Sequence, residues 1–194
     1  MVIATRHTRY ADPVGRVLDH IDDATAEWIS RQHMFFVGTA PESGGRVNLS
    51  PKGLDSFRVL SSTLVAYVDF TGSGAETIAH IRDNGRVTFM FCAFTGPPRI
   101  VRLYGTGTIH LPGSASSNDL LTLFPRRRGV RSIITADLDR VQDSCGYAVP
   151  LMDFVEDRIR LDTWIEERTD EAIAAYWEDK NRVSIDGLPA LDPE

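Results

Sequence analysis

The sequence predicts a mainly β protein, an antiparallel β-barrel with peripheral helices. Seven to nine segments have the composition and alternation of strands and follow one another through short turns, whereas only three or four segments carry helix signals. This order differs from the regular β-α-β alternation that produces a parallel sheet. A barrel is the expected closure because it leaves no sheet edge exposed.

The first part of the chain is expected to form a short helix followed by four strands. Residues 1–22 have no sustained period and form a predicted N-terminal arm. Asp22 and Asp23 then precede good helix formers, as the positive end of a helix dipole favours. The predicted elements are a helix at 24–32, a hairpin of 34–40 with 46–50 around the turn 41–45, and strands at 57–60 and 63–69.

A helix is predicted to begin near Ser73, because Ser73 and Glu76 have the spacing of a capping box. Asn84 and Gly85 are expected to end it. The later elements are the long paired strands 86–94 and 99–110, a helix at 118–124 capped by Ser116 or Ser117, strands at 132–141 and 147–151, a hairpin at 154–161, and a final helix at 170–180 capped by Thr169.

Composition and charge exclude several classes of function. The net charge is −6, so nucleic acid is a poor default partner. The longest apolar run covers only residues 87–94, and the N-terminus carries no apolar stretch behind its basic residues, so neither a membrane span nor a secretory signal is expected. The five histidines and two cysteines lack the spacing of a metal site. We expect a cytoplasmic protein without a metal.

Two segments could hold an anionic, planar ligand. In the first, Asn48 to Gly53, a strand ends in Ser50, a proline, the cation Lys52 and a glycine. A surface turn explains the same residues. In the second, Asp69 to Thr77, two glycines and three hydroxyls stand where a helix begins and where unpaired N–H groups favour a phosphate. Simple capping of the helix by Ser73 and Glu76 is the alternative.

Two further segments are weaker candidates. Arg99 and Arg102 are three residues apart on a predicted strand, so only one of them can face a given site. Cys145 precedes a glycine but has no neighbouring histidine, which favours an inert side chain over a reactive thiol.

Together these segments resemble the pyridoxamine 5'-phosphate oxidase-like family of FMN-binding split barrels. The resemblance runs from about Asp23 to about Leu161 and depends on the order of the motifs 48–53, 71–77, 84–87 and 99–105. It implies a homodimer of six-stranded antiparallel split barrels at 23–161, followed by a C-terminal helical extension at 162–194. It also implies FMN at the dimer interface, held by Asn48, Leu49, Ser50, Lys52, Gly53, Thr71, Ser73, Gly74, Thr77 and Arg102.

The chain departs from true pyridoxamine phosphate oxidases at two places. Its phosphate loop, residues 72–76, contains no cation, so Lys52 or Arg82 would have to compensate. The C-terminal Trp-x-Arg element is also absent, since Trp164 is followed by Ile165 and Glu166. The resemblance therefore implies an FMN-dependent oxidoreductase for another small organic substrate. The alternatives are a deazaflavin-dependent reductase on the same fold and a non-catalytic flavin or haem sensor.

Overall fold

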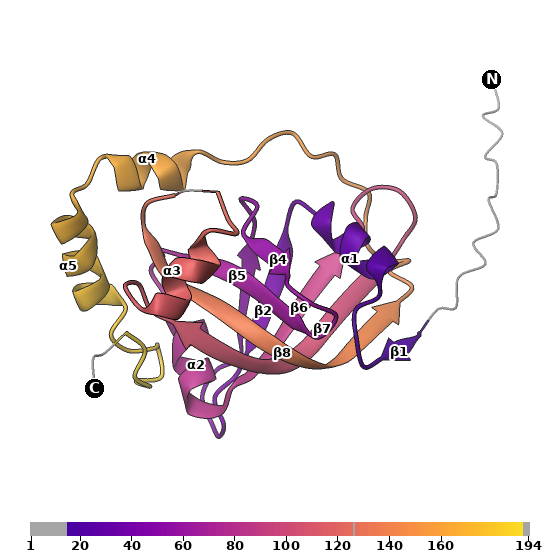
Figure 1. The fold of residues 1–194 in the computed structure, drawn as a ribbon, viewed down its shortest axis with the longest axis horizontal. Coiled ribbons are helices and arrows are strands. Elements are labelled where there is room, and N and C mark those ends of the chain that lie inside the picture. Colours follow the sequence, from indigo (N-terminus) through magenta and orange to yellow (C-terminus); the bar gives the residue numbers. More distant parts are fainter. Residues whose placement is uncertain (1–14, 126, 192–194) are drawn as a thin grey trace.

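A single curled antiparallel sheet forms the body of the molecule in the computed structural model, which describes residues 15–125 and 127–191 (Figure 1). Eight strands belong to it within these residues, in the order β3-β2-β6-β7-β8-β5-β4, with β1 beside β8. The strands are β1 (Val17–Leu18), β2 (Phe35–Thr39), β3 (Asn48–Lys52), β4 (Phe57–Val59), β5 (Leu64–Phe70), β6 (Arg86–Cys92), β7 (Ile100–His110) and β8 (Val130–Ser144).

The pairing confirms the predicted mainly β fold with peripheral helices. The hairpin of β2 with β3 and the antiparallel pair of β6 with β7 both form as expected. The sheet has eight strands in place of the six that the family resemblance implies. Strands β3 and β4 are its two edges and follow each other in the chain, so the turn at residues 53–56 bridges the split between them.

Five helices surround this sheet in the described chain: α1 (Asp23–Ser30), α2 (Glu76–Asn84), α3 (Ala115–Leu121), α4 (Arg160–Glu166) and α5 (Asp170–Lys180). Helix α2 places Ile78, Ala79 and Ile81 in the main hydrophobic core. It ends at Gly85, whose φ of 75° is the left-handed conformation that glycine adopts without strain. Figure 1 shows α4 and α5 together at one side of the sheet, remote from α1.

The core lies inside the curl of the sheet. Its centre is an aromatic cluster in which Phe35 contacts Phe57, Tyr67 and Phe91 with ring centroids 4.9 to 5.8 Å apart. Strand β5 is buried on both faces, because Val65 and Tyr67 face this core while Ala66 and Val68 pack in a second cluster with Phe124, beyond α3. Such burial fixes the register of β5.

Four predicted features are wrong: the cap of one helix, the start of another, a strand and a hairpin. Helix α2 has Ala75 at its N-cap and no side-chain cap, so Ser73 and Glu76 do not form the expected capping box. Helix α3 begins at Ala115, because Ser114 accepts the N–H of Ser117 and caps the helix earlier than predicted. The segment 147–161 contains neither the strand nor the hairpin expected there. It runs without regular structure until α4 begins at Arg160.

The structure also bears on the predicted absence of a membrane span and on the predicted N-terminal arm. None of the described helices is long and apolar enough to span a bilayer. Of the predicted N-terminal arm at residues 1–22, residues 1–14 lie outside the described residues, and Val17–Leu18 form β1 beside β8. The cytoplasmic location and the domain boundaries stay predictions.

Candidate functional site

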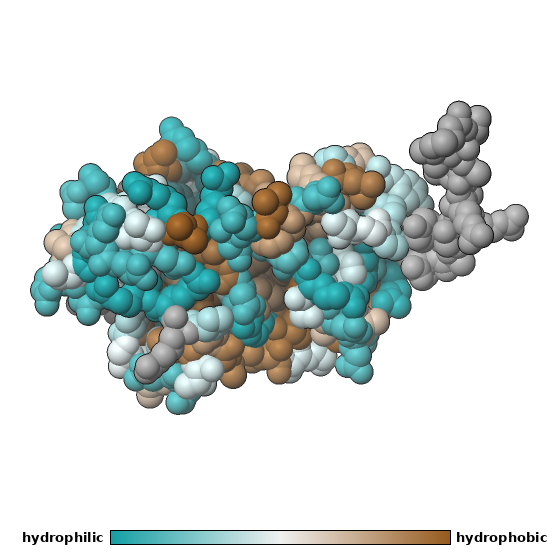
Figure 2. Space-filling model, turned by 90° about the horizontal axis from the view of Figure 1, so that it is seen from above, coloured by the Kyte–Doolittle hydropathy of each residue, from teal (hydrophilic) through white to brown (hydrophobic). Residues whose placement is uncertain are grey.

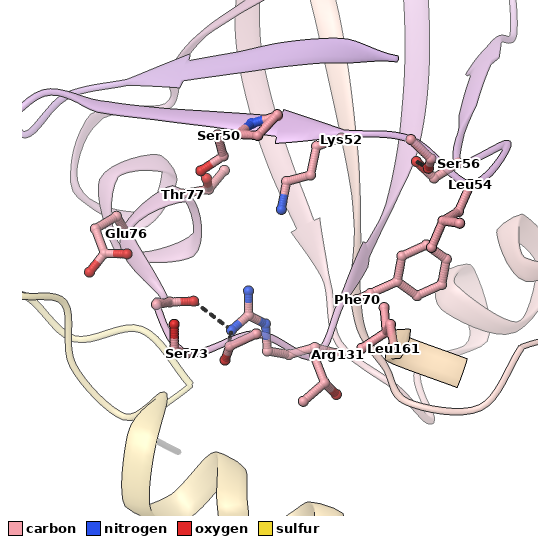
Figure 3. Close-up of a pocket in the computed structure, with 15 residues that line it drawn as sticks. Ser50, Lys52, Leu54, Ser56, Phe70, Ser73, Glu76, Thr77, Arg131 and Leu161 are labelled. Carbon is pink, nitrogen blue, oxygen red and sulfur yellow. Dashed lines mark hydrogen bonds between the residues drawn. The ribbon is translucent and has the colours of Figure 1, made fainter. Parts of the chain in front are cut away.

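A polar cavity of about 460 Å³ lies between β3, the end of β5 and the start of α2 (Figure 3). Ser50 and Lys52 project into it from the edge strand β3, because residues two apart on a strand share a face. The loop from Thr71 to Gly74 forms the opposite wall, and Arg131 of β8 forms its floor. The cavity therefore joins the two segments that the sequence predicts as ligand-binding.

A buried carboxylate organises the cavity. Asp69, with no exposed side-chain surface, pairs with Lys52 at 2.9 Å and with the Nη2 atom of Arg131 at 2.7 Å. Burial by itself raises the pKa of Asp69, but the charges and hydrogen bonds of Lys52 and Arg131 outweigh burial and hold this pKa below its ordinary value. The group of three carries one net positive charge at neutral pH.

An irregularity of β8 brings Arg131 to this position. In the pairing of β5 with β8, Asp69 is opposite Ser132 and Phe70 is opposite Val130, so Arg131 has no direct partner in the ladder. Adjacent residues of a regular strand project to opposite faces, whereas a bulge redirects a side chain. The bulge thus allows Arg131, which is only 4% exposed, to reach Asp69.

Hydrogen bonds to Arg131 and Gly129 hold the loop 71–74 in place. Arg131 donates from Nη1 to the carbonyl oxygen of Gly74 at 2.7 Å and to that of Gly72 at 3.4 Å. Thr71 donates both its backbone N–H and its hydroxyl to Gly129, at 2.9 and 2.8 Å. A loop with so many fixed contacts is organised before any ligand binds.

A hydrogen-bonded chain supports the other wall. The amide of Asn48 bonds Thr39 at 3.1 Å and Thr77 at 3.0 Å, and its oxygen accepts the hydroxyl of Ser50 at 3.0 Å. Thr39 in turn bonds Nδ1 of the buried His80 at 3.1 Å. Asn48 therefore stands behind the cavity and fixes the hydroxyls of Ser50 and Thr77, which line it.

An apolar groove of about 640 Å³ adjoins the polar cavity and shares the wall 51–54 and Leu161 with it. Phe154, Trp164 and Met34 contribute much of its lining. The Phe154 ring stacks on His33 with centroids 3.7 Å apart and an interplanar angle of 5°. A charged end and an aromatic end therefore meet along the edge strand β3.

Comparison with known proteins gives a match over most of the sheet. Residues 21–145 match the family model described as pyridoxamine 5'-phosphate oxidase. The chain is also 41% identical over 195 residues to the pyridoxamine 5'-phosphate oxidase family protein ustO of Aspergillus flavus, covering 89% of this chain and 76% of that protein. This chain belongs to the pyridoxamine 5'-phosphate oxidase family.

Solved structures resemble this chain at the level of fold. A variant of HupZ from Group A Streptococcus superimposes with a TM-score of 0.51 at 22% identity, over 63% of this chain and 98% of that chain. HupZ itself gives a TM-score of 0.49, also at 22% identity, over 62% of this chain and 91% of that chain. The curled antiparallel sheet, with its split between β3 and β4, has the split-barrel architecture of the family.

The structure brings most of the predicted site residues of this family member together. Leu49 is 64% exposed on the outer face of β3, and Arg102 donates to Ser144 at 3.3 Å, so neither lines the polar cavity. Asn48 lies one layer behind it. The predicted residues that line the cavity are Ser50, Lys52, Gly53, Thr71, Ser73, Gly74 and Thr77.

Sequence reasoning missed Arg131 and the role of Asp69. Arg131 lies in none of the predicted ligand-binding segments, yet it is buried against Asp69 and lines the cavity. Arg127 and Arg128 pair with Asp162 and Asp170. The described residues contain no group of three or more His, Cys, Asp or Glu side chains placed to hold a metal.

Proposed function

We propose that this protein is an oxidoreductase that binds FMN and acts on a small organic substrate. The observation that carries the proposal is the junction of the polar cavity, with Lys52 and Arg131, and the apolar groove beside it. A phosphorylated flavin has these two ends, a dianion and a planar ring. Family membership supports the same cofactor class.

The donor set of the cavity fits a phosphate. Lys52 has three N–H donors and, among the described residues, one hydrogen-bond acceptor, Asp69, which leaves donors for a ligand. The hydroxyls of Ser50, Ser73 and Thr77 stand around it. Glu76 also lines the cavity, but its carboxylate accepts the N–H of Ile185 at 3.1 Å, which offsets part of its repulsion.

In this proposal a bound flavin supplies hydride transfer, and the chain supplies binding and orientation. Lys52 neutralises charge on the phosphate, while the fixed hydroxyls of Ser50 and Thr77 set its orientation. Pro51, Leu54 and Leu161, which line both cavities, exclude water from the ring. No side chain of the cavity is required as an acid or a base.

We also propose that the functional unit is a homodimer. The segment 147–159 forms neither helix nor strand and carries large apolar side chains that are strongly exposed, including Leu151, Val155 and Ile159. Figure 2, viewed from above onto the face that this segment crosses in Figure 1, shows hydrophobic surface in brown among hydrophilic groups. A second copy of the chain would cover these side chains and complete the groove that includes Phe154.

Replacing Lys52 tests the proposed cofactor. Lys52→Met keeps the aliphatic stem and removes the charge, so the dissociation constant for FMN should rise about ten- to a hundredfold, as expected for a lost charged hydrogen bond. Riboflavin, which lacks the phosphate, should bind both proteins equally. Flavin fluorescence quenching measures both affinities.

The chain offers a matched control in its other lysine, Lys180, which is exposed on α5. Lys180→Met should bind FMN as the wild type does. A wild-type protein that binds neither FMN nor riboflavin contradicts the proposal and leaves the deazaflavin alternative. Tight FMN binding without turnover of a nicotinamide donor and a dye acceptor would favour the sensor.

A further inference from the structure

The segment 170–191, from α5 to the last described residue, contacts the cavity loop at residues 71–76 from its outer side. It does so at three points. Trp177 donates its indole N–H to the hydroxyl of Thr71 at 2.9 Å, and the side-chain amide of Asn181 donates to the carbonyl oxygen of Gly72 at 3.0 Å. The backbone N–H of Ile185 donates to Glu76 at 3.1 Å. Figure 3 shows the yellow ribbon of this segment beside Ser73 and Glu76.

The same segment is anchored firmly to the body of the molecule. Ala190 is completely buried in the main core, and Leu188 and Leu191 pack against that core. Asp186 pairs with Arg46, which precedes β3, and also accepts the backbone N–H of Arg46 at 2.7 Å. The contacts to the loop therefore come from an ordered support.

Arg131 of the barrel and Asn181 of the C-terminal segment both hold the loop. Both donate to the carbonyl oxygen of Gly72, at 3.4 and 3.0 Å, and Arg131 also bonds Gly74. Asn181 has no exposed surface, so its donor is committed to this contact in a buried setting where a lost hydrogen bond is costly. The loop is thus fixed between the barrel and the C-terminal segment.

We propose that the segment 170–191 positions the loop 71–76 for anion binding, with Trp177 and Asn181 as positioning residues. This inference goes beyond the proposed function and, in its ligand-binding part, rests on it. A loop that is ordered in advance loses less conformational entropy when it closes on a phosphate. The contact of Trp177 with Thr71 should therefore contribute to the affinity for the phosphate, although Trp177 does not line the cavity.

The test compares Trp177→Phe with Tyr176→Phe, its neighbour on α5. The first change removes the donor to Thr71 and keeps an aromatic ring, whereas the second removes a hydroxyl from a residue that packs on Trp164. Trp177→Phe should weaken FMN binding about five- to tenfold, the effect of one hydrogen bond. It should leave riboflavin binding unchanged, and Tyr176→Phe should change neither.

A second measurement needs no ligand. Amide hydrogen exchange of residues 71–76 in the ligand-free protein should be about five- to tenfold faster in Trp177→Phe than in Tyr176→Phe. Equal exchange in the two variants, or an equal loss of FMN and riboflavin affinity, overturns the positioning role. If the wild type binds no flavin, the proposed function fails and the exchange rates still decide this inference.

Discussion

Asp69 is the residue on which the polar cavity depends. It is fully buried, and a buried charge is tolerated only when it is paired and hydrogen-bonded. Lys52 and Arg131 provide three hydrogen bonds of 2.7 to 2.9 Å to its two oxygens. Because Arg131 also bonds the loop carbonyls, the charge on Asp69 indirectly determines the shape of the loop.

Replacing Asp69 by Asn should destabilise the protein by about 3–5 kcal/mol at pH 7, because Arg131 loses its buried counter-ion. The folded-state pKa of Asp69 lies below its ordinary value. Its contribution to stability is therefore fully present above about pH 4, the ordinary value of an aspartate, and is lost as the pH falls through the folded-state pKa. Urea unfolding at several pH values measures the difference between the two proteins.

The difference between wild type and Asp69→Asn should accordingly shrink as the solution is acidified. A constant difference between pH 7 and pH 3 would contradict the assigned ionisation. Asp179→Asn serves as the control, because Asp179 is exposed beside Lys180 and such surface pairs contribute at most about 1 kcal/mol.

At the scale of elements, α1 depends on the cap at Asp22. Its carboxylate accepts the N–H of Thr25 at 2.8 Å, and hydrogen bonds from the side chain and then the backbone of Thr25 lower the pKa of Asp22 from 3.8 to about 2. Asp22→Ala should lower the free energy of unfolding by about 1 kcal/mol. The corresponding shift of the melting temperature is about 2–4 °C for a chain of this size.

Asn is also a good N-cap, so Asp22→Asn should retain most of the stability. It loses only the charge interaction with Arg16, which is 2.6 Å away and partly exposed. Thermal unfolding followed by circular dichroism compares the three proteins. If Asn and Ala were equally destabilising, the hydrogen bond to Thr25 would not be the source of the effect.

The elements that sequence predicts well are those with local signals. The hairpin of β2 and β3 follows from alternation on both sides of a turn, and α5 follows from its cap at Thr169. Residues 147–161 contain similar apolar alternation but no pairing strand in the described structure, so local pattern alone misassigned them. The capping box failed for a related reason, since the carboxylate of Glu76 bonds Ile185, which is distant in sequence.

In the candidate site, too, only the parts with local sequence signals could be predicted. Ser50, Lys52 and the loop from Thr71 were identifiable because a cation, hydroxyls and glycines stand at strand and helix ends. Arg131 was not identifiable, because its direction depends on a bulge that strict strand alternation does not contain. The contact of Trp177 with Thr71 joins residues 106 positions apart and has no sequence signal.

At the scale of the whole molecule, the exposed apolar surface is unevenly distributed. Six exposed apolar side chains belong to the segment 147–159, and Val155 is 87% exposed. They are Tyr147, Leu151, Met152, Phe154, Val155 and Ile159. Clustered exposed apolar side chains of this kind are typical of interaction surfaces, which supports the proposed homodimer. Leu49 and Val47 add exposed apolar side chains at β3, the sheet edge that carries Ser50 and Lys52.

The proposed homodimer makes the last prediction. Light scattering should give twice the chain mass of 21.6 kDa for the wild type. The double change Val155→Glu with Ile159→Glu should yield monomers, because burying two unpaired carboxylates costs more than the apolar contact contributes. Leu123→Glu, at an exposed apolar position near α3, should leave the dimer intact.

A wild type that is monomeric at micromolar concentration contradicts the dimer. If the partner completes the groove, the monomeric variant should also lose affinity for riboflavin, which Lys52→Met does not; unchanged affinity would show that one chain binds the ring alone.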